Sequence, residues 1–164
     1  MRSTLLTTVA AVIVLALSAS AWAAGGGGGG GSSDTPIAKP VDANYARAKA
    51  MIEAKDYKGA LPLLQQVVAK NPKNADAYNL LGYATRKSGN PQGSLQYYTT
   101  ALQIDPKHLG ANEYIGEAYL MLDRPAEANQ HLARLDTLCT FGCTEYRMLK
   151  AAIADYKAGK KPTN

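Results

Sequence analysis

The chain has 164 residues, two cysteines and a formal net charge of +5. The positive charges are scattered along the chain, except for a short basic tail at residues 159–164. This distribution argues against a nucleic-acid-binding protein, because that class needs a basic stripe with exposed aromatics. No phosphate-binding loop, nucleophile elbow or paired-histidine motif is present, so we expect no catalysis, no cofactor and no bound metal.

The amino end has the pattern of an export signal followed by a tether. Met1-Arg2 precede an apolar stretch that ends in Ala21-Trp22-Ala23, the small-x-small form that signal peptidase recognises. We therefore predict a cleaved signal peptide at residues 1–23 and a periplasmic or secreted mature protein. The stretch also approaches the roughly 20 residues of a membrane span, so the alternative is an uncleaved membrane anchor. Residues 24–40, rich in glycine, serine and proline, are predicted to form a flexible linker.

The rest of the chain repeats at a constant interval. Small or turn-forming residues recur in one register, with residue numbers that differ by 34 at each step: Pro72 with Pro106, Gly82 with Gly116, and Ala60 with Ser94 and Ala128. This interval divides the sequence into segments 41–74, 75–108 and 109–142. Each segment holds two stretches with apolar residues spaced near 3.6, as amphipathic helices require, so each is predicted to form a helical hairpin.

These segments resemble the tetratricopeptide repeat family. The second segment follows the family pattern best and departs from it only at Thr85; its matching residues are Tyr78, Leu81, Gly82, Ser94, Tyr98, Ala101 and Pro106. The third segment has Thr140 in place of the proline, and the first misses the front of the pattern, as terminal repeats often do. The resemblance implies an all-α fold at residues 41–158, a right-handed superhelical stack of helix-turn-helix hairpins (an α-solenoid). A further amphipathic stretch at 144–158 is predicted to be the capping helix.

The resemblance also implies a concave groove lined by the first helix of each hairpin. The family's groove positions, carried over to this sequence one by one, give the candidate partner-binding residues Tyr45, Lys49, Asn79, Tyr83, Arg86, Lys87, Glu113 and Glu117. The alternative is structural. Arg86 and Lys87 would then pair with the two glutamates as surface salt bridges worth only about 0–1 kcal/mol, and the tyrosines would fill space between helices.

Some members of the family clamp the carboxyl terminus of heat-shock chaperones with lysine, asparagine and arginine side chains. The corresponding positions here hold Tyr45, Lys49, Leu80, Gly110 and Tyr114. Since nearly all of the required side chains are missing, we expect no chaperone carboxylate clamp.

Cys139 and Cys143 lie between the last repeat and the predicted capping helix. Two cysteines in an exported chain favour a disulfide. Residues four apart on one helix place their β-carbons roughly 5–6 Å apart, beyond the roughly 3.5–4.5 Å of a disulfide, so the bridge requires a bend at Phe141-Gly142. The alternatives are a redox-active pair or two buried free thiols. A zinc site is not expected, because neither histidine has a recognisable ligand spacing from the pair.

The sequence therefore predicts a non-catalytic interaction scaffold or adaptor of the cell envelope that binds an unidentified peptide or protein segment in its groove. One alternative is a structural repeat protein that forms a homo-oligomer. The other, less favoured, is a thiol redox protein that uses Cys139 and Cys143.

Overall fold

The structure is a computed structural model that describes residues 41–160 and 162. The predicted signal peptide and linker (1–23 and 24–40), and residues 161, 163 and 164 of the basic tail, lie outside the described residues. The regular structure of the described part consists of helices: α1 (Ala43–Glu53), α2 (Tyr57–Lys70), α3 (Ala75–Lys87), α4 (Pro91–Ile104), α5 (Leu109–Met121), α6 (Pro125–Leu138) and α7 (Thr144–Lys157).

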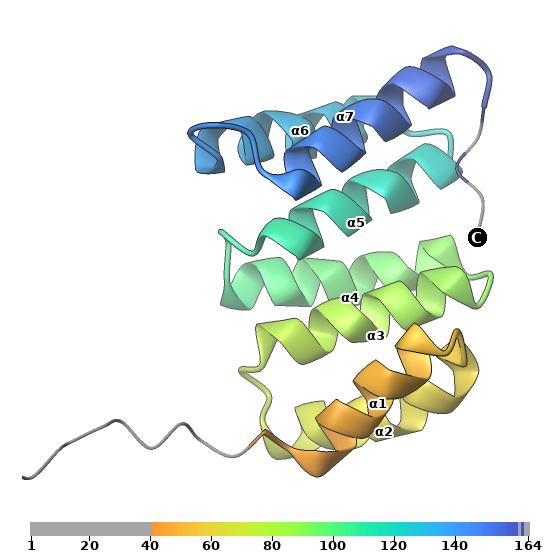
Figure 1. The fold of residues 1–164 in the computed structure, drawn as a ribbon, viewed down its shortest axis with the longest axis vertical. Coiled ribbons are helices and arrows are strands. Elements are labelled where there is room, and N and C mark those ends of the chain that lie inside the picture. Colours follow the sequence, from red (N-terminus) through yellow and green to blue (C-terminus); the bar gives the residue numbers. More distant parts are fainter. Residues whose placement is uncertain (1–40, 161, 163–164) are drawn as a thin grey trace, which may run out of the picture. The chain divides into compact units, whose positions relative to one another are not determined.

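These helices form a stack of antiparallel hairpins, as Figure 1 shows. Each segment of the repeat holds one hairpin: α1 with α2, α3 with α4, and α5 with α6. Neighbouring hairpins pack through α2 on α3 and α4 on α5, while the first helices form a row in which α1 contacts α3 and α3 contacts α5. The predicted all-α stack of helical hairpins is confirmed. No helix among residues 41–160 is both long and apolar enough to cross a lipid bilayer.

The backbone repeats with the same period as the sequence. The turn inside each hairpin is closed by a residue with positive φ, at Lys55 (62°), Gly89 (95°) and Asp123 (57°), which occupy equivalent positions of the three segments. Only the middle turn has the glycine for which this conformation is free of steric strain. Each segment therefore turns at the same position, whether that position holds glycine, lysine or aspartate.

A small residue at the eighth position of each segment lets the helices approach closely. A Cβ added at Gly82 would lie 2.5 Å from the ring of Tyr98 on α4, and one added at Gly116 would lie 2.6 Å from Cδ2 of Leu149 on α7. Both partner side chains are fully buried. Because such distances are shorter than van der Waals contact, a larger residue at either position would overpack the core.

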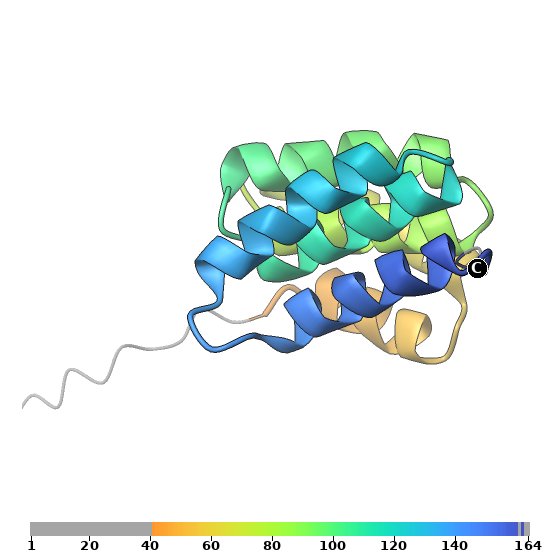
Figure 2. The same cartoon turned by 90° about the horizontal axis from the view of Figure 1, so that it is seen from above.

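Helix α7 closes the stack by packing on α5 and α6. It repeats the apolar pattern of the first helices, since Leu81, Ile115 and Leu149 follow one another at the interval of the repeat, and all three are buried. Seen from above, α6 and α7 lie over the rest of the stack (Figure 2). The last helix thus occupies the place that the first helix of a fourth repeat would take.

Candidate partner-binding groove

The candidate binding residues lie on α1, α3 and α5, the contacting row of first helices. Their exposure divides them into two groups. Lys49 is exposed, and four others are partly exposed, namely Tyr45, Tyr83, Lys87 and Glu117. Asn79, Arg86 and Glu113 are 7%, 2% and 3% exposed. The sequence placed all of these residues on the first helices, but it did not indicate that three polar side chains among them are buried.

Arg86 is the centre of the most ordered part of this surface. Its Nη2 atom lies 2.7 Å from Oε2 of Glu117 on α5, and its Nε donates to the Tyr98 hydroxyl at 3.4 Å. The guanidinium carbon also lies 5.5 Å and 5.6 Å from the ring centroids of Tyr83 and Tyr114, within the range of cation–π attraction. Arg86 is therefore held inside the fold and is not a free cation for an acidic partner.

The structural alternative, in which arginine and lysine of α3 pair with glutamates of α5, is present in part, but the pair that forms is buried. Arg86 does pair with Glu117, yet both side chains are largely buried, at 3% and 18% exposure, so the pair is not a solvated surface bridge. Lys87 makes no salt bridge among the described residues, and burial, with Arg86 nearby, lowers the pKa of its ammonium. Breaking a buried pair by removing one partner is much more destabilising than breaking a surface pair.

Tyrosine rings from all three hairpins extend across this surface. Tyr57 at the start of α2 packs edge-on against Tyr83 with ring centroids 5.9 Å apart, and Tyr83 lies 4.9 Å from Tyr114 on α5. Tyr114 in turn lies 6.3 Å from the buried Tyr98. Sequence reasoning missed Tyr57 and Tyr114 as members of this group. Tyr114 adjoins the predicted Glu113, whereas Tyr57 has no counterpart in the other repeats, which carry proline at that position.

Glu113 and Asn79 are buried polar side chains whose hydrogen-bonding capacity is not filled. In the described part of the chain, Oε1 of Glu113 and Oδ1 of Asn79 have no hydrogen-bond partner. Burial raises the pKa of the Glu113 carboxyl to about 8, and the negative charges of Glu117 and Glu145 add to the effect. Buried polar atoms are nearly always bonded in native proteins, so an unpartnered amide oxygen and carboxyl oxygen on two contacting helices require an explanation.

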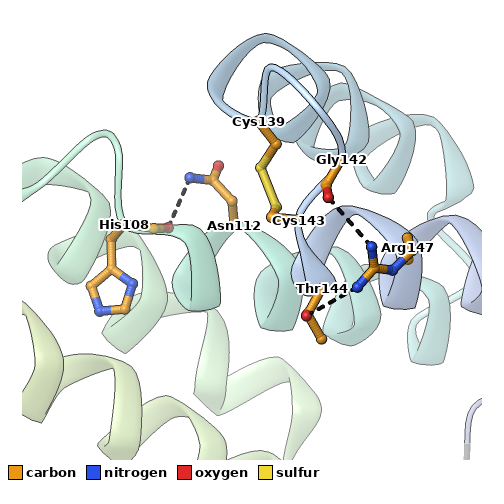
Figure 3. The surroundings of a disulfide bond; sticks show 7 residues. All are labelled: His108, Asn112, Cys139, Gly142, Cys143, Thr144 and Arg147. Carbon is orange, nitrogen blue, oxygen red and sulfur yellow. Dashed lines mark hydrogen bonds between the residues drawn. A yellow bond between two sulfur atoms is a disulfide. The ribbon is translucent and has the colours of Figure 1, made fainter.

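The predicted disulfide joins the end of α6 to the start of α7 (Figure 3). Cys139 and Cys143 have Cα atoms 5.4 Å apart, a typical separation for a disulfide. The chain bends between them at Gly142, whose φ is 75° and whose N–H donates to the Cys139 carbonyl at 3.0 Å. Arg147 steadies the turn by donating to the Gly142 carbonyl at 3.4 Å. The bend that the sequence required for this bridge is present.

Sequence models of tetratricopeptide repeats match residues 45–108 and 85–153, so that together they extend from the first hairpin into α7. The chain belongs to the tetratricopeptide repeat family. This family assignment agrees with the hairpin stack and with the repeating register of its buried positions.

Curated relatives share only part of their length with this chain. Human protein O-mannosyl-transferase TMTC3 is 26% identical over 106 residues, which are 65% of this chain and 10% of the relative. The Drosophila melanogaster protein of that name is 32% identical over 75 residues, 46% of this chain and 8% of the relative. The chain thus spans about a tenth of the length of these relatives.

Solved structures show the same architecture. MamA from Desulfovibrio magneticus RS-1 is 28% identical with a TM-score of 0.56, over 58% of this chain and 54% of that one. PcrH, solved in complex with the chaperone binding region of PopD, is 17% identical with a TM-score of 0.63, over 71% of this chain and 90% of that one. At 17% identity, the likeness to PcrH establishes a shared fold alone.

Proposed function

We propose that this protein is a non-catalytic scaffold or adaptor of the cell envelope. It binds a peptide or protein segment along the face formed by α1, α3 and α5. The family supports a protein-interaction role in general, and a complex with a partner segment exists for PcrH. The transferase activity in the relatives' name is not carried over, because the match covers so little of those proteins.

The observation that carries the proposal is the buried Arg86 and the tyrosines that it holds. The equivalent residues of the first and third repeats are Ile52 and Leu120, so those repeats use an apolar side chain there. A protein in which apolar side chains replace both partners of a buried ion pair is often as stable as the original, or more stable. Stability alone therefore does not account for Arg86.

The contacts of Arg86 supply a different reason for its presence. Between Glu117 and the rings of Tyr83 and Tyr114, its guanidinium fixes an aromatic surface of which both tyrosines remain partly exposed. Rigid tyrosines give large contact area at a low cost in side-chain entropy, which is why they dominate binding hot spots. A pre-organised tyrosine surface suits a partner that binds across neighbouring hairpins.

Capture of partners from native envelope extract tests this proposal. The bait is the full chain, as wild type, as a Tyr83→Ala, Asn79→Ala double variant, and as a control with Gln96→Ala and Thr99→Ala. The control residues are exposed on α4, outside the row of first helices. We expect wild type and control to retain the same partner and the groove variant to lose it. A groove variant that keeps every partner would place the binding site elsewhere.

The exported location is part of the same proposal. It is supported by the signal pattern at residues 1–23 and by the Cys139–Cys143 disulfide, a bond typical of oxidising compartments. Mass spectrometry of the protein from its native envelope should find a mature chain that begins near Ala24. An intact amino terminus on membrane-associated protein would favour the uncleaved anchor instead.

A further inference from the structure

Asn79 and Glu113 occupy equivalent positions on adjacent helices. Each is at the fifth position of its segment, on α3 and on α5, and these two helices contact each other. Asn79 also approaches α5 closely: a Cβ added at Gly110, one turn before Glu113, would lie 3.3 Å from Asn79 Nδ2. Glu113 in turn lies within electrostatic range of Arg86 on α3. Both side chains therefore lie at the contact between α3 and α5.

Both atoms that lack partners here are oxygens that accept hydrogen bonds once the Glu113 carboxyl has lost its proton. Asn79 Oδ1 can only accept a hydrogen bond, and so can Glu113 Oε1 when the carboxyl is ionised. A ligand that satisfies both atoms has to bring donors. Apolar side chains would leave both oxygens unpaired as they are in the free protein, whereas donors would relieve a cost of about 1–3 kcal/mol for each group.

The charges that face Glu113 are mostly of its own sign. Glu117 on α5 and Glu145 on α7 are acidic, and the cation that faces it from α3 is Arg86. Arg86 is already bound to Glu117 at 2.7 Å. Among the described residues, Glu113 therefore has no counter-ion of its own, and a second carboxylate brought by a partner would be repelled.

Glu113 lies between two partly exposed positions of α5. On α5, the neighbours of Glu113 one turn before and one turn after are Gly110 and Glu117, and both are partly exposed. Residues three and four apart share one face of a helix. The strip of α5 that carries Glu113 thus borders solvent before and after it. Glu113 itself is 3% exposed, so a long side chain of a partner reaches its carboxyl only when the Glu113 side chain turns outward between these neighbours.

From these observations we infer that the partner inserts a basic side chain, arginine or lysine, between α3 and α5, where it donates a hydrogen bond to Asn79 and forms an ion pair with Glu113. The inference rests on the proposed groove binding and names the chemistry that the groove selects. Arginine fits best, because its planar fork can bind a carboxylate with two N–H groups and leaves further donors for the amide oxygen.

Such binding should release a proton. Because burial raises the pKa of Glu113 to about 8, the free carboxyl is mostly protonated at pH 7, whereas an ion pair with the partner requires it to be ionised. Arg86, Glu117 and Glu145 face Glu113 in the free and in the bound protein. Tyr114 also interacts with Glu113, but its raised pKa of about 12 keeps its hydroxyl protonated at pH 7. We therefore expect the proton released on binding to come from Glu113.

Selection from a random nonapeptide display library, followed by calorimetry, tests the inference. The baits are the full chain as wild type, as Glu113→Gln, as the Tyr83→Ala, Asn79→Ala double variant, and as Asp136→Asn, which removes an exposed carboxylate from α6. We expect wild type and Asp136→Asn to select peptides with a recurrent arginine or lysine. Glu113→Gln should bind those peptides about tenfold more weakly, the scale of a lost charged hydrogen bond. At pH 7, calorimetry in two buffers of different ionisation enthalpy should show proton release for wild type and none for Glu113→Gln.

Two results would overturn the inference, and only the second would also overturn the proposed groove binding. Peptides selected without a basic residue, or bound equally by Glu113→Gln, would refute the basic side chain and leave groove binding intact. If wild type selects no peptide beyond those selected by the Tyr83→Ala, Asn79→Ala variant, the proposed groove binding fails and the inference fails with it.

Discussion

Replacing Glu113 with glutamine should stabilise the protein in alkaline solution and leave its stability nearly unchanged near pH 4. In the fold, burial and the neighbouring glutamates raise the pKa of this carboxyl from its ordinary value of 4.5 to about 8. Between these values the folded chain retains a proton that the unfolded chain has lost. The free energy of unfolding of the wild type therefore falls as pH rises through this window.

The size of the effect follows from the interval between the two pKa values. At about 1.36 kcal/mol for each pH unit, the interval would correspond to about 5 kcal/mol. Relaxation of the fold and entry of water around the ionised carboxyl reduce this figure, so we expect a difference of about 2 kcal/mol at pH 9. Glutamine has the shape of the protonated carboxyl and cannot ionise, so the variant does not share the loss.

Urea unfolding followed by circular dichroism at pH 4, 7 and 9 measures the difference directly. Asp136→Asn is the matched control, because it removes the same charge from an exposed position and should change stability by less than about 0.5 kcal/mol at each pH. A stability difference between Glu113→Gln and wild type that does not grow with pH would show that burial does not hold the Glu113 carboxyl neutral.

Three further changes test the packing around this face. Gly82→Ala should lower stability by about 2 kcal/mol in thermal unfolding, since its Cβ would meet the Tyr98 ring at 2.5 Å; an unchanged melting temperature would contradict this packing. Arg86→Met should lower the free energy of unfolding by about 3 kcal/mol, because it leaves the largely buried Glu117 without its partner. Adding Glu117→Gln should recover part of this loss. Equal stability of Arg86→Met and wild type would argue against a buried ion pair. Cys139→Ser should cost about 2 kcal/mol, the scale for a short loop, and two reactive thiols in oxidised native protein would show that the bridge does not form.

The helices and their pairing could be predicted because they depend on local spacing. The repeat places glycine at position 82 and again at position 116, and in the structure both lie where a neighbouring helix leaves no room for a Cβ. The bend at Gly142 was predictable for a similar reason. A disulfide between residues four apart cannot form on one continuous helix, so the chain had to turn between the cysteines.

The burial of the polar side chains could not be predicted from spacing alone. Glu113 and Glu117 are one turn apart and have the spacing of a solvated pair, yet only Glu117 forms an ion pair with Arg86. Because α7 packs on α5, Glu145 instead lies close enough to raise the pKa of Glu113. These contacts depend on how the helices sit in three dimensions. One signal was available, because an arginine at position 86 replaces the apolar residues of the other repeats.

Site-specific photo-cross-linking in the native envelope tests the central claim, that the face of α1, α3 and α5 holds a protein partner. A photo-reactive phenylalanine placed at position 83, where Tyr83 is partly exposed, is compared with one placed at the exposed Thr99 on α4. We expect a discrete cross-linked protein from position 83 and none from position 99. No product at position 83, or the same products at both positions, would contradict the claim.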